Sequence, residues 1–427
     1  MSFKTLDMKR VPILLAIAAL SGACQEPTQP PSLRLDQSDA AVVRVAAPTG
    51  NPAVDIPNIR AAVAAATPGA VIQFAHGTYD IGNSRETQFV VSAPGVTLQG
   101  DRRGTTLSGV ELHADDPDAF TCCPLLSGTF LLNGGHQTVR RLTFDGYLWA
   151  ISLGAPGSVT GGYHIEHNTF RAGFVGIDFA GLSDEPTIIE ENTFENVTAP
   201  LFILGKTLRI RRNRFAITNP GRMTFGQPSQ AVILFPEFLS GTTGCENNVI
   251  EGNTVVRFNE AFVFFLFDAS WVCHNNVIRD NRVIDARIYN AIPFFSDNGT
   301  MALFVGPGRT ENNLIQNNVL RGSEGLGVVL DAGSGNQIIG NEFHDLPGLK
   351  STFSGYPGTA IILGAATSGN RVRGNEFENV VNTVVDLGTD NSVKGARQNA
   401  ARLSAQRVAA PEPSEPSKLL LFRRMRN

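Results

Sequence analysis

The sequence predicts an all-β protein wound as a solenoid, a parallel β-helix, and three observations lead to this fold class. A short motif built around asparagine recurs along most of the chain. Apolar residues within its copies alternate with a period of two, as they do in strands. Gly (43) and Phe (27) are abundant while only 17% of the 427 residues are charged, as expected for a repetitive, turn-rich chain with a phenylalanine-filled interior.

The repeated unit reads N-x-[I/V]-x-x-N-x-[F/V/L]. Five copies follow it, at residues 248–255, 276–283, 313–320, 336–343 and 370–377. Earlier copies keep only the second half of the unit, at 165–170, 189–194 and 210–215. At 139–144 Leu142 takes the asparagine position, and 393–398 is a decayed terminal copy.

The second asparagine of the unit sets the length of a coil. It falls at positions 168, 192, 213, 253, 281, 318, 341 and 375. We therefore expect coils of 21–24 residues, with the longer steps carrying an insertion or an extra coil. Strands of neighbouring coils lie about 4.8 Å apart, so Ile or Val and Phe should stack into one continuous core. The asparagines should form a hydrogen-bonded ladder at a bend.

Residues 1–23 predict a secretion signal. Lys9 and Arg10 precede the apolar run Val11–Leu20, and the small residues Ser21–Ala23 follow. Ten apolar residues are too few to span a bilayer. Cleavage after Ala23 would expose Cys24 for lipidation, although the same bond also suits ordinary secretion. The chain is therefore expected to be exported, as an outer-membrane or cell-surface lipoprotein or as a periplasmic or secreted protein.

Both ends of the mature chain are expected to lie outside the solenoid. Residues 24–53 form a tether that begins with the Pro-rich segment Gln25–Pro31. Residues 399–427 are linker-like and end in the basic, apolar segment Lys418–Asn427. This segment caps the solenoid, lies on a membrane or partner, or frays. We expect membrane contact only through a lipid at Cys24.

Residues 54–398 resemble the pectate-lyase-like superfamily of right-handed parallel β-helices, through the repeats and Ile59–Tyr79. The resemblance implies a single-stranded right-handed parallel β-helix with a short N-terminal capping helix, expected at Pro57–Ala66. A Pro68–Gly69 turn and a strand at Val71–Phe74 would follow, and Gly95–Gly109 resembles the next coil. The superfamily contains lyases, hydrolases, epimerases, adhesins and phage tailspikes, so the resemblance specifies fold and not activity.

The cysteines other than Cys24 suggest one disulfide. Cys245 and Cys273 each lie eight residues before a ladder asparagine, so neighbouring coils would bring their Cα atoms within disulfide range. An exported protein meets an oxidising compartment. The adjacent Cys122 and Cys123 could pair with each other or elsewhere. The absence of a CxxC pair argues against a cysteine metal cluster.

One position beyond the two cysteines, Glu246, His274 and Glu311 should form a column. Two carboxylates and an imidazole in register could bind a divalent cation such as Ca²⁺ or transfer protons. The alternative is a solvated turn with an incidental ion pair.

A second column lies two residues before the ladder asparagine and alternates in sign: Glu190, Arg211, Glu251 and Arg279. At strand spacing these side chains should neutralise one another, so this face is not a polyanion groove. The net charge of -4 and the lack of a nucleic-acid motif also exclude a nucleic-acid partner.

Three segments after ladder strands, at 216–244, 284–311 and 344–368, are expected to be insert loops projecting from one side. Such loops carry function on repeat scaffolds. Their aromatic and charged residues would form a sugar-binding cleft or, alternatively, bury themselves over the core. We assign substrate binding to Arg222, Phe238, Phe295, Lys350 and Tyr356.

A polysaccharide lyase on this fold needs a base and a group that neutralises a uronate, as the resemblance implies. Asp285, Arg287 and Tyr289 are the best local match. Hydrolases of the superfamily cluster aspartates on consecutive coils. The four candidates lie at unequal offsets from the ladder, which argues against one shared column: Asp178, Asp268, Asp331 and Asp386.

Two functional hypotheses follow. The protein binds a polysaccharide, expected to be acidic, and in the catalytic version cleaves it as a lyase or hydrolase. Alternatively, it is a non-catalytic adhesin or structural protein of the cell envelope. Whether it is an enzyme stays open, and no cofactor is certain, Ca²⁺ being the candidate. We expect a monomer whose partner is a polysaccharide or cell-surface glycan.

Overall fold

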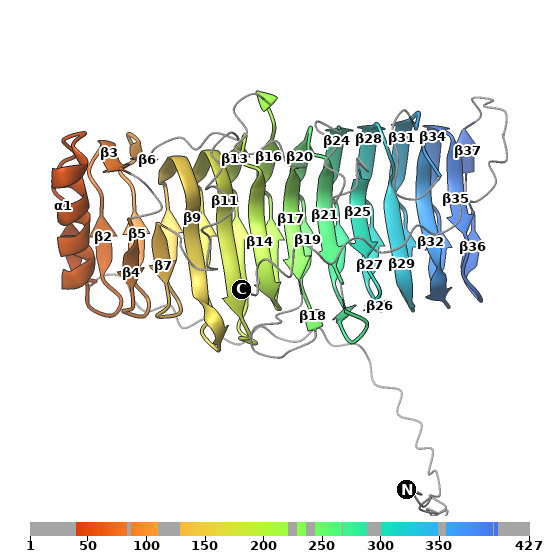
Figure 1. The fold of residues 1–427 in the computed structure, drawn as a ribbon, viewed down its shortest axis with the longest axis horizontal. Coiled ribbons are helices and arrows are strands. Elements are labelled where there is room, and N and C mark those ends of the chain that lie inside the picture. Colours follow the sequence, from red (N-terminus) through yellow and green to blue (C-terminus); the bar gives the residue numbers. More distant parts are fainter. Residues whose placement is uncertain are drawn as a thin grey trace, which may run out of the picture. The chain divides into compact units, whose positions relative to one another are not determined.

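The computed structural model describes residues 40–82, 87–109, 129–220, 229–235, 244–266, 268–287, 300–348, 356–395 and 397–399. These residues form a right-handed parallel β-helix with a single helix, α1 (Pro52–Ala65) (Figure 1). The strands pair in parallel from one coil to the next. The predicted fold class is confirmed. Within the described residues, no helix has the length and apolar character needed to cross a membrane.

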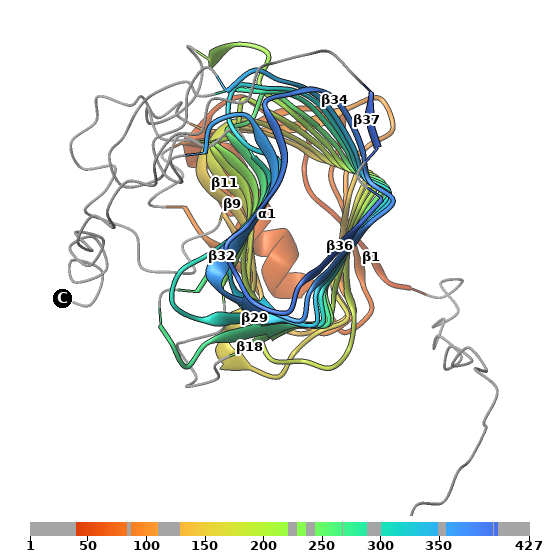
Figure 2. The same ribbon diagram turned by 90° about the vertical axis from the view of Figure 1, so that its right-hand side faces the viewer.

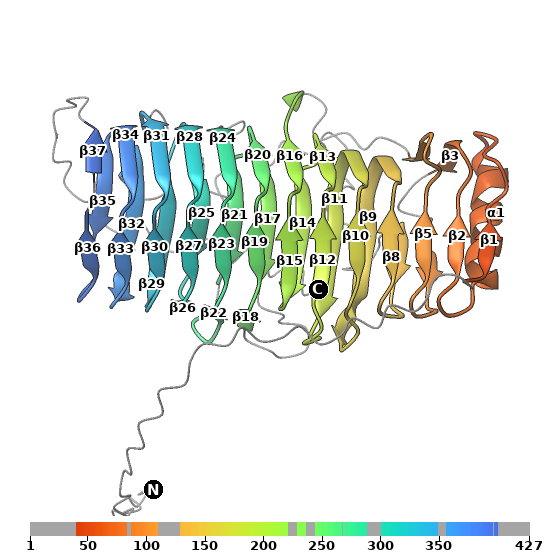
Figure 3. The same ribbon diagram turned by 180° about the vertical axis from the view of Figure 1, so that it is seen from behind.

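The strands fall into three sheets that surround the interior, with α1 at one end (Figure 2). The first sheet runs along the back of the view in Figure 1 and faces the reader in Figure 3. Its strands, in order, are β1 (Val42–Arg44), β2 (Val71–Gln73), β5 (Thr97–Gln99), β8 (Thr138–Arg140), β10 (His164–Glu166), β12 (Thr187–Glu190), β15 (Leu208–Arg211), β19 (Val249–Glu251), β23 (Val277–Arg279), β27 (Leu314–Gln316), β30 (Gln337–Ile339), β33 (Arg371–Arg373) and β36 (Ser392–Lys394).

The second sheet follows the first after a tight bend in each coil. Its strands are β3 (Gly77–Gly82), β6 (Thr105–Gly109), β9 (Thr143–Ser158), β11 (Thr169–Gly181), β13 (Thr193–Glu195), β16 (Arg214–Ala216), β20 (Thr254–Val256), β24 (Arg282–Ala286), β28 (Val319–Ser323), β31 (Glu342–Leu346), β34 (Glu376–Val380) and β37 (Arg397–Asn399).

The third sheet completes each coil. The long strands β9 and β11 run through both the second and the third sheets. The other strands are β4 (Phe89–Val91), β7 (Phe130–Leu132), β14 (Ala199–Gly205), β17 (Gln230–Phe235), β21 (Glu260–Phe265), β25 (Thr300–Val305), β29 (Val328–Ser334), β32 (Thr359–Ser368) and β35 (Asn382–Asp386). Three short strands pair beyond it, β18 (Gly244–Glu246), β22 (Val272–His274) and β26 (Arg309–Glu311).

The bend between the first two sheets explains the asparagine of the repeat. The residue before the asparagine adopts a left-handed conformation, as at Glu191 and Arg212 (φ 56° and 53°). The buried Asn192 then donates to Asn213 Oδ1 of the next coil (3.1 Å) and to Ile165 O (2.8 Å). The ladder runs from Asn168 to Asn375, as predicted.

A second ladder forms where each coil enters the first sheet. It uses the first asparagine of the unit, and its members are Asn248, Asn276, Asn313, Asn336, Asn370 and Asn391. Both ladders satisfy backbone groups that the turns leave without strand partners.

The interior is a stack of equivalent side chains. Phe144, Phe170, Phe194 and Phe215 lie with neighbouring ring centroids 4.6–5.1 Å apart and nearly parallel planes. The isoleucines of the first sheet are equally buried. Stacking is therefore the source of the core, because no single coil could enclose these rings alone.

The N-terminal boundary differs from the prediction. Helix α1 begins at Pro52 and not at Pro57, because Asn51 caps it by accepting a hydrogen bond from Ala53 N (3.0 Å). Val42–Arg44 forms β1 and pairs with β2, within the segment 24–53 expected to be a tether. The fold thus includes residues before the predicted boundary at 54, since this β-branched segment adds a strand to the sheet.

The three predicted insert loops are also shorter than expected. Each contains a strand of the third sheet: β17 within 216–244, β25 within 284–311 and β32 within 344–368. The repeat motif covers only the first two sheets, so it does not predict the third strand of these coils.

Candidate functional site

The predicted disulfide links neighbouring coils. Cys245 pairs with Cys273, with Cα atoms 4.6 Å apart. Both residues are buried. The reasoning from equal offsets to the ladder is confirmed, while Cys122 and Cys123 lie outside the described residues.

The predicted column of Glu246, His274 and Glu311 is in register. His274 Nε2 pairs with Glu246, and Lys206 Nζ lies 3.6 Å from the same carboxylate. Glu311 pairs with Arg309 (3.5 Å). The ligand atoms of the three residues do not all lie within 4.8 Å of one another, so metal binding here stays a prediction.

The predicted catalytic residues are only partly placed. Asp285 accepts from Arg287 Nε (2.8 Å) and from Arg257 Nε (3.2 Å). Tyr289 lies outside the described residues. Asp285 is a half-buried carboxylate of β24 that pairs with two guanidiniums, and its catalytic role stays a prediction.

Of the predicted substrate-binding residues, one can be located. Arg222, Phe238, Phe295 and Lys350 lie outside the described residues. Tyr356 packs against an apolar cluster on the outer side of the third sheet. This contact agrees with the alternative that aromatic residues shield the core.

The outer side of the third sheet carries a row of aromatic rings. Trp149 and Phe202 lie 6.1 Å apart, Phe202 and Phe235 lie 5.1 Å apart, and Phe235 and Phe265 lie 5.2 Å apart. Trp149, Phe235 and Phe265 are each only 5% exposed. These rings therefore form a second buried apolar cluster, and they are not exposed as a surface on which sugar rings could stack.

Asp178 lies on the same sheet, in register with Ser152 and Phe202. It is 2% exposed. Burial raises the pKa of Asp178 to about 7, and its hydrogen bond with Ser152 offsets only part of this effect. Asp178, Asp331 and Asp386 do not share one register, as their offsets predicted.

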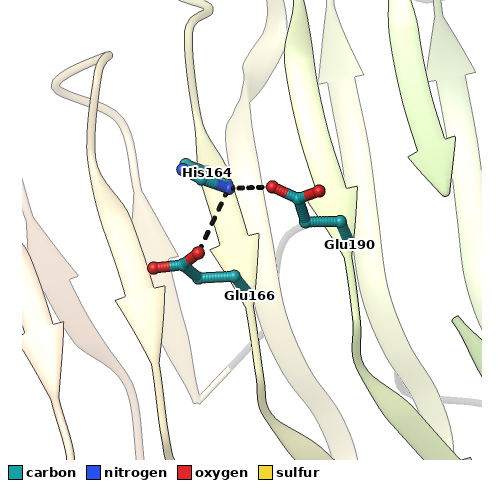
Figure 4. Close-up of side chains that lie close together, drawn as sticks. All are labelled: His164, Glu166 and Glu190. Carbon is teal, nitrogen blue, oxygen red and sulfur yellow. Dashed lines mark hydrogen bonds and ion pairs between the residues drawn. The ribbon is translucent and has the colours of Figure 1, made fainter. Parts of the chain in front are cut away.

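A histidine between two glutamates lies on the outer face of the first sheet (Figure 4). His164 Nε2 is 2.8 Å from Glu190 Oε1 and 3.5 Å from Glu166 Oε2. Among the described residues, this is the group of three whose ligand atoms all lie within 4.8 Å of one another. Burial opposes ionisation of Glu190, but hydrogen bonds from Arg211 and His164 outweigh it and lower the pKa of that carboxyl.

An open depression of about 280 Å³ lies beside the bend between the first two sheets. Its polar lining includes Thr143 and Thr169 from neighbouring coils, with Arg102, Arg141 and His167 around them. The bend between β5 and β6 spans residues 100–104 and is longer than those of the following coils, and its residues Asp101, Arg102 and Gly104 line the depression.

The two threonines belong to a longer row that we term the Thr–Arg column. It occupies the half-exposed or exposed position between the bend and the buried apolar residue of the second sheet. Its members, each in register with the next, are Thr106, Thr143, Thr169, Thr193, Arg214, Thr254 and Arg282. The column then changes character, because Val319, Glu342 and Glu376 continue it.

The cations of this region have no acidic partner in the described part of the chain. Arg102, Arg141, Arg214 and Arg282 make no ion pair there. In contrast, Arg211 and Arg279 of the first sheet donate to Glu190 (2.7 Å) and Glu251 (2.6 Å). From Thr169 onward the sequence signal for this column is the residue that follows each ladder asparagine.

Comparisons with known proteins give one family model and several solved structures. A protein-family model described as "Periplasmic copper-binding protein (NosD)" matches residues 295–395. No curated protein matches the sequence. Solved structures with a similar path include the Dettilon tailspike protein, with a TM-score of 0.48 and 13% identity, covering 81% of this chain and 62% of the tailspike. The chain thus spans less than two thirds of that protein.

Two enzymes are similar at the same level. The Yersinia enterocolitica family 28 exopolygalacturonase gives a TM-score of 0.46 at 10% identity, covering 84% of this chain and 79% of the enzyme. A PL6 alginate lyase in complex with a trisaccharide gives 0.49 at 12% identity, covering 88% and 90%. At such identities the likeness concerns the chain path alone and decides nothing about ligand or reaction.

The segment matched by the copper-binding family does not fit a copper centre. Residues 295–395 contain one histidine, His344, one methionine, Met301, and no cysteine. Met301 is fully buried in the core, and both ring nitrogens of His344 face glutamates. Copper prefers several imidazole or sulfur ligands. The strand topology establishes a right-handed parallel β-helix, as the repeats predicted.

Proposed function

We propose that this protein is exported and binds an acidic polysaccharide along the Thr–Arg column. The observation that carries the proposal is the row itself: seven consecutive coils present hydroxyl or guanidinium groups in register, with no carboxylate among them. A linear polymer can lie across successive coils and meet equivalent groups at each step.

The chemistry of the column suits sugars that carry acid groups. Threonine hydroxyls both donate and accept hydrogen bonds, as sugar hydroxyls do. Guanidinium groups pair with carboxylates in a bidentate geometry. Arg141 and Arg102 add two further cations at the depression beside Thr143.

The spacing of the cations argues against a nucleic acid. Arg214 and Arg282 are two coils apart, which is about 10 Å at strand spacing. A DNA duplex carries about one charge per 1.7 Å. Within the column there is also no aromatic side chain on which a base could stack.

The cellular setting is part of the proposal. Residues 1–23 have the charge and hydropathy order of a secretion signal, and Cys24 follows a suitable cleavage site. We propose that a lipid at Cys24 tethers the β-helix to the envelope, where extracellular glycans are accessible.

The test compares two double variants of the full-length chain. Arg214→Ala/Arg282→Ala removes two cations of the column, and Arg371→Ala/Arg373→Ala removes two exposed cations of β33 on the first sheet. Binding of polygalacturonate, alginate and neutral dextran is measured by titration calorimetry, with and without Ca²⁺. We expect the first variant to bind the acidic polymers at least ~10-fold more weakly, since each charge-assisted contact contributes about 1 kcal/mol.

The control variant should bind like the wild type, and dextran should bind weakly to all three proteins. Equal losses in both variants, or equal binding of dextran, would contradict the proposal. The same incubations are examined for unsaturated or new reducing ends, which decide whether binding is accompanied by lyase or hydrolase activity.

A further inference from the structure

Three donor atoms converge on the outer face of the first sheet, on the other side of the bend from the Thr–Arg column. His164 and Glu166 extend from β10, and Glu190 extends from the neighbouring strand β12 (Figure 4). Both carboxylates approach the same ring nitrogen, His164 Nε2, at 2.8 Å from Glu190 and 3.5 Å from Glu166.

The remaining oxygens of these carboxylates face guanidinium groups. Glu190 Oε2 accepts from Arg211 Nε (2.7 Å) and from Arg212. Glu166 Oε1 lies 3.7 Å from Arg140, whose Nε donates to Gln99 Oε1 (2.7 Å). The guanidinium contacts thus fix one oxygen of each glutamate, and the other oxygen points towards the imidazole. Outer partners of this kind orient metal ligands in proteins.

The separations are close to those that a tetrahedral metal ion needs. Zinc binds nitrogen and carboxylate oxygen at about 2.0–2.2 Å, which places neighbouring ligand atoms about 3.3–3.6 Å apart. The observed separations of 2.8 and 3.5 Å require only small side-chain shifts. Three protein ligands also leave a fourth position for water or a ligand oxygen.

We propose that His164 Nε2, Glu166 Oε2 and Glu190 Oε1 bind a divalent first-row metal ion such as Zn²⁺. The ion takes the place of the proton that Nε2 shares with the carboxylates. An imidazole ligand favours Zn²⁺ over Ca²⁺, which is bound almost entirely by oxygen. The flanking guanidiniums offset the two carboxylate charges. The site therefore favours an ion that binds the imidazole nitrogen strongly, as Zn²⁺ does, over an ion that binds through carboxylate charge alone.

Two other histidine–glutamate groups provide matched controls. His344 faces Glu378 through Nδ1 (2.9 Å) and Glu342 through Nε2 (3.3 Å), so its two carboxylates approach different nitrogens. His274 has one glutamate partner, Glu246, which Lys206 also approaches. Neither group gathers three donors around one point.

The test titrates Zn²⁺ and Ca²⁺ into the chelator-treated full-length protein by calorimetry. The variants are His164→Ala and Glu166→Gln, with His344→Ala as the control, and thermal unfolding verifies that each is folded. We expect His164→Ala and Glu166→Gln to lose one equivalent of Zn²⁺ or to bind it at least ~10-fold more weakly. His344→Ala should retain it, and Ca²⁺ should not compete.

Two results would overturn the metal site. One is a wild-type protein that binds no Zn²⁺. The other is a His164→Ala or Glu166→Gln variant that keeps wild-type stoichiometry and affinity, which would leave the group as an ion-pair network. Glycan binding by the wild type after chelation is measured separately, so failure of the metal site does not affect the proposed polysaccharide function.

Discussion

The first and second sheets each carry a row of arginines, and the two rows differ in whether the arginines are paired with acidic side chains. On the first sheet Arg211 and Arg279 alternate with Glu190 and Glu251, and each arginine is paired with an acid. On the second sheet Arg214 and Arg282 alternate with threonine, and neither has an acidic partner in the part of the chain that the structure describes.

The difference shows what register does in a solenoid. A charge on one coil meets whatever the next coil presents about 4.8 Å away. Acid and base in alternation cancel and stabilise the face slightly, whereas base and hydroxyl in alternation leave a positive potential available to an anion. We therefore expect anionic ligands to bind the Thr–Arg column, whose arginines have no acidic partner in the described part of the chain.

The largest expected effect tests the interior beneath both columns. Phe194 is fully buried between Phe170 and Phe215 (centroids 4.6 and 5.0 Å apart). We expect Phe194→Ala to lower the free energy of unfolding by about 3–5 kcal/mol, because it removes a stacked ring and leaves a cavity. Denaturant unfolding measures this. A loss below about 1 kcal/mol would mean that the stack does not support the two columns.

A second prediction concerns Asp178, a buried carboxyl on the third sheet that hydrogen-bonds with Ser152. Burial raises the pKa of Asp178 to about 7, whereas the unfolded chain titrates near 3.8. Ionisation therefore opposes folding above pH 7, and this cost disappears as the pH falls towards 4. We expect Asp178→Asn to stabilise the protein by about 2–4 kcal/mol at pH 8.

The stability gap between Asp178→Asn and the wild type should narrow at pH 6 and vanish near pH 4, as measured by denaturant unfolding. A gap that is independent of pH would show that Asp178 is not a buried, protonatable group.

A smaller effect on stability is expected for the acid–base column of the first sheet, in which Glu190 and Glu251 alternate with Arg211 and Arg279. Hydrogen bonds from Arg211 and His164 lower the pKa of Glu190 despite its burial. Ionised Glu190 therefore stabilises the folded protein above its unfolded pKa of about 4.5. This contribution is lost as the pH falls through the lower pKa of the folded state. We expect Glu190→Gln to cost about 1 kcal/mol at pH 7, because the arginine partners are partly exposed.

The matched control is Glu251→Gln, whose partner Arg279 is about half exposed. Its cost should stay below about 0.5 kcal/mol. Equal losses of unfolding free energy in Glu190→Gln and Glu251→Gln would contradict the distinction between a buried and an exposed ion pair. A loss in Glu190→Gln that persists at pH 3 would contradict it as well.

Much of the fold could be predicted because solenoid packing repeats a local pattern. The asparagine at each bend and the phenylalanine two residues later specify the first two sheets and even the Cys245–Cys273 pairing. The third sheet has no such motif, since strands such as β17 and β25 are apolar runs without a fixed bend residue. The sequence pattern therefore does not distinguish them from loops.

The candidate sites were harder to predict for a related reason. The column of Glu246, His274 and Glu311 was identified by offset, but offset does not give the direction or the partners of a side chain. His164 and Glu190 belong to different positions of the repeat, so no single column in the sequence joins them.

The most direct measurement is arginine-selective labelling with phenylglyoxal, with each peptide quantified by mass spectrometry, in the presence and absence of an acidic oligosaccharide. The account predicts protection of Arg141, Arg214 and Arg282, and unchanged labelling of the exposed Arg371 and Arg373. Protection of the latter pair, or no protection along the Thr–Arg column at saturating ligand, would contradict it.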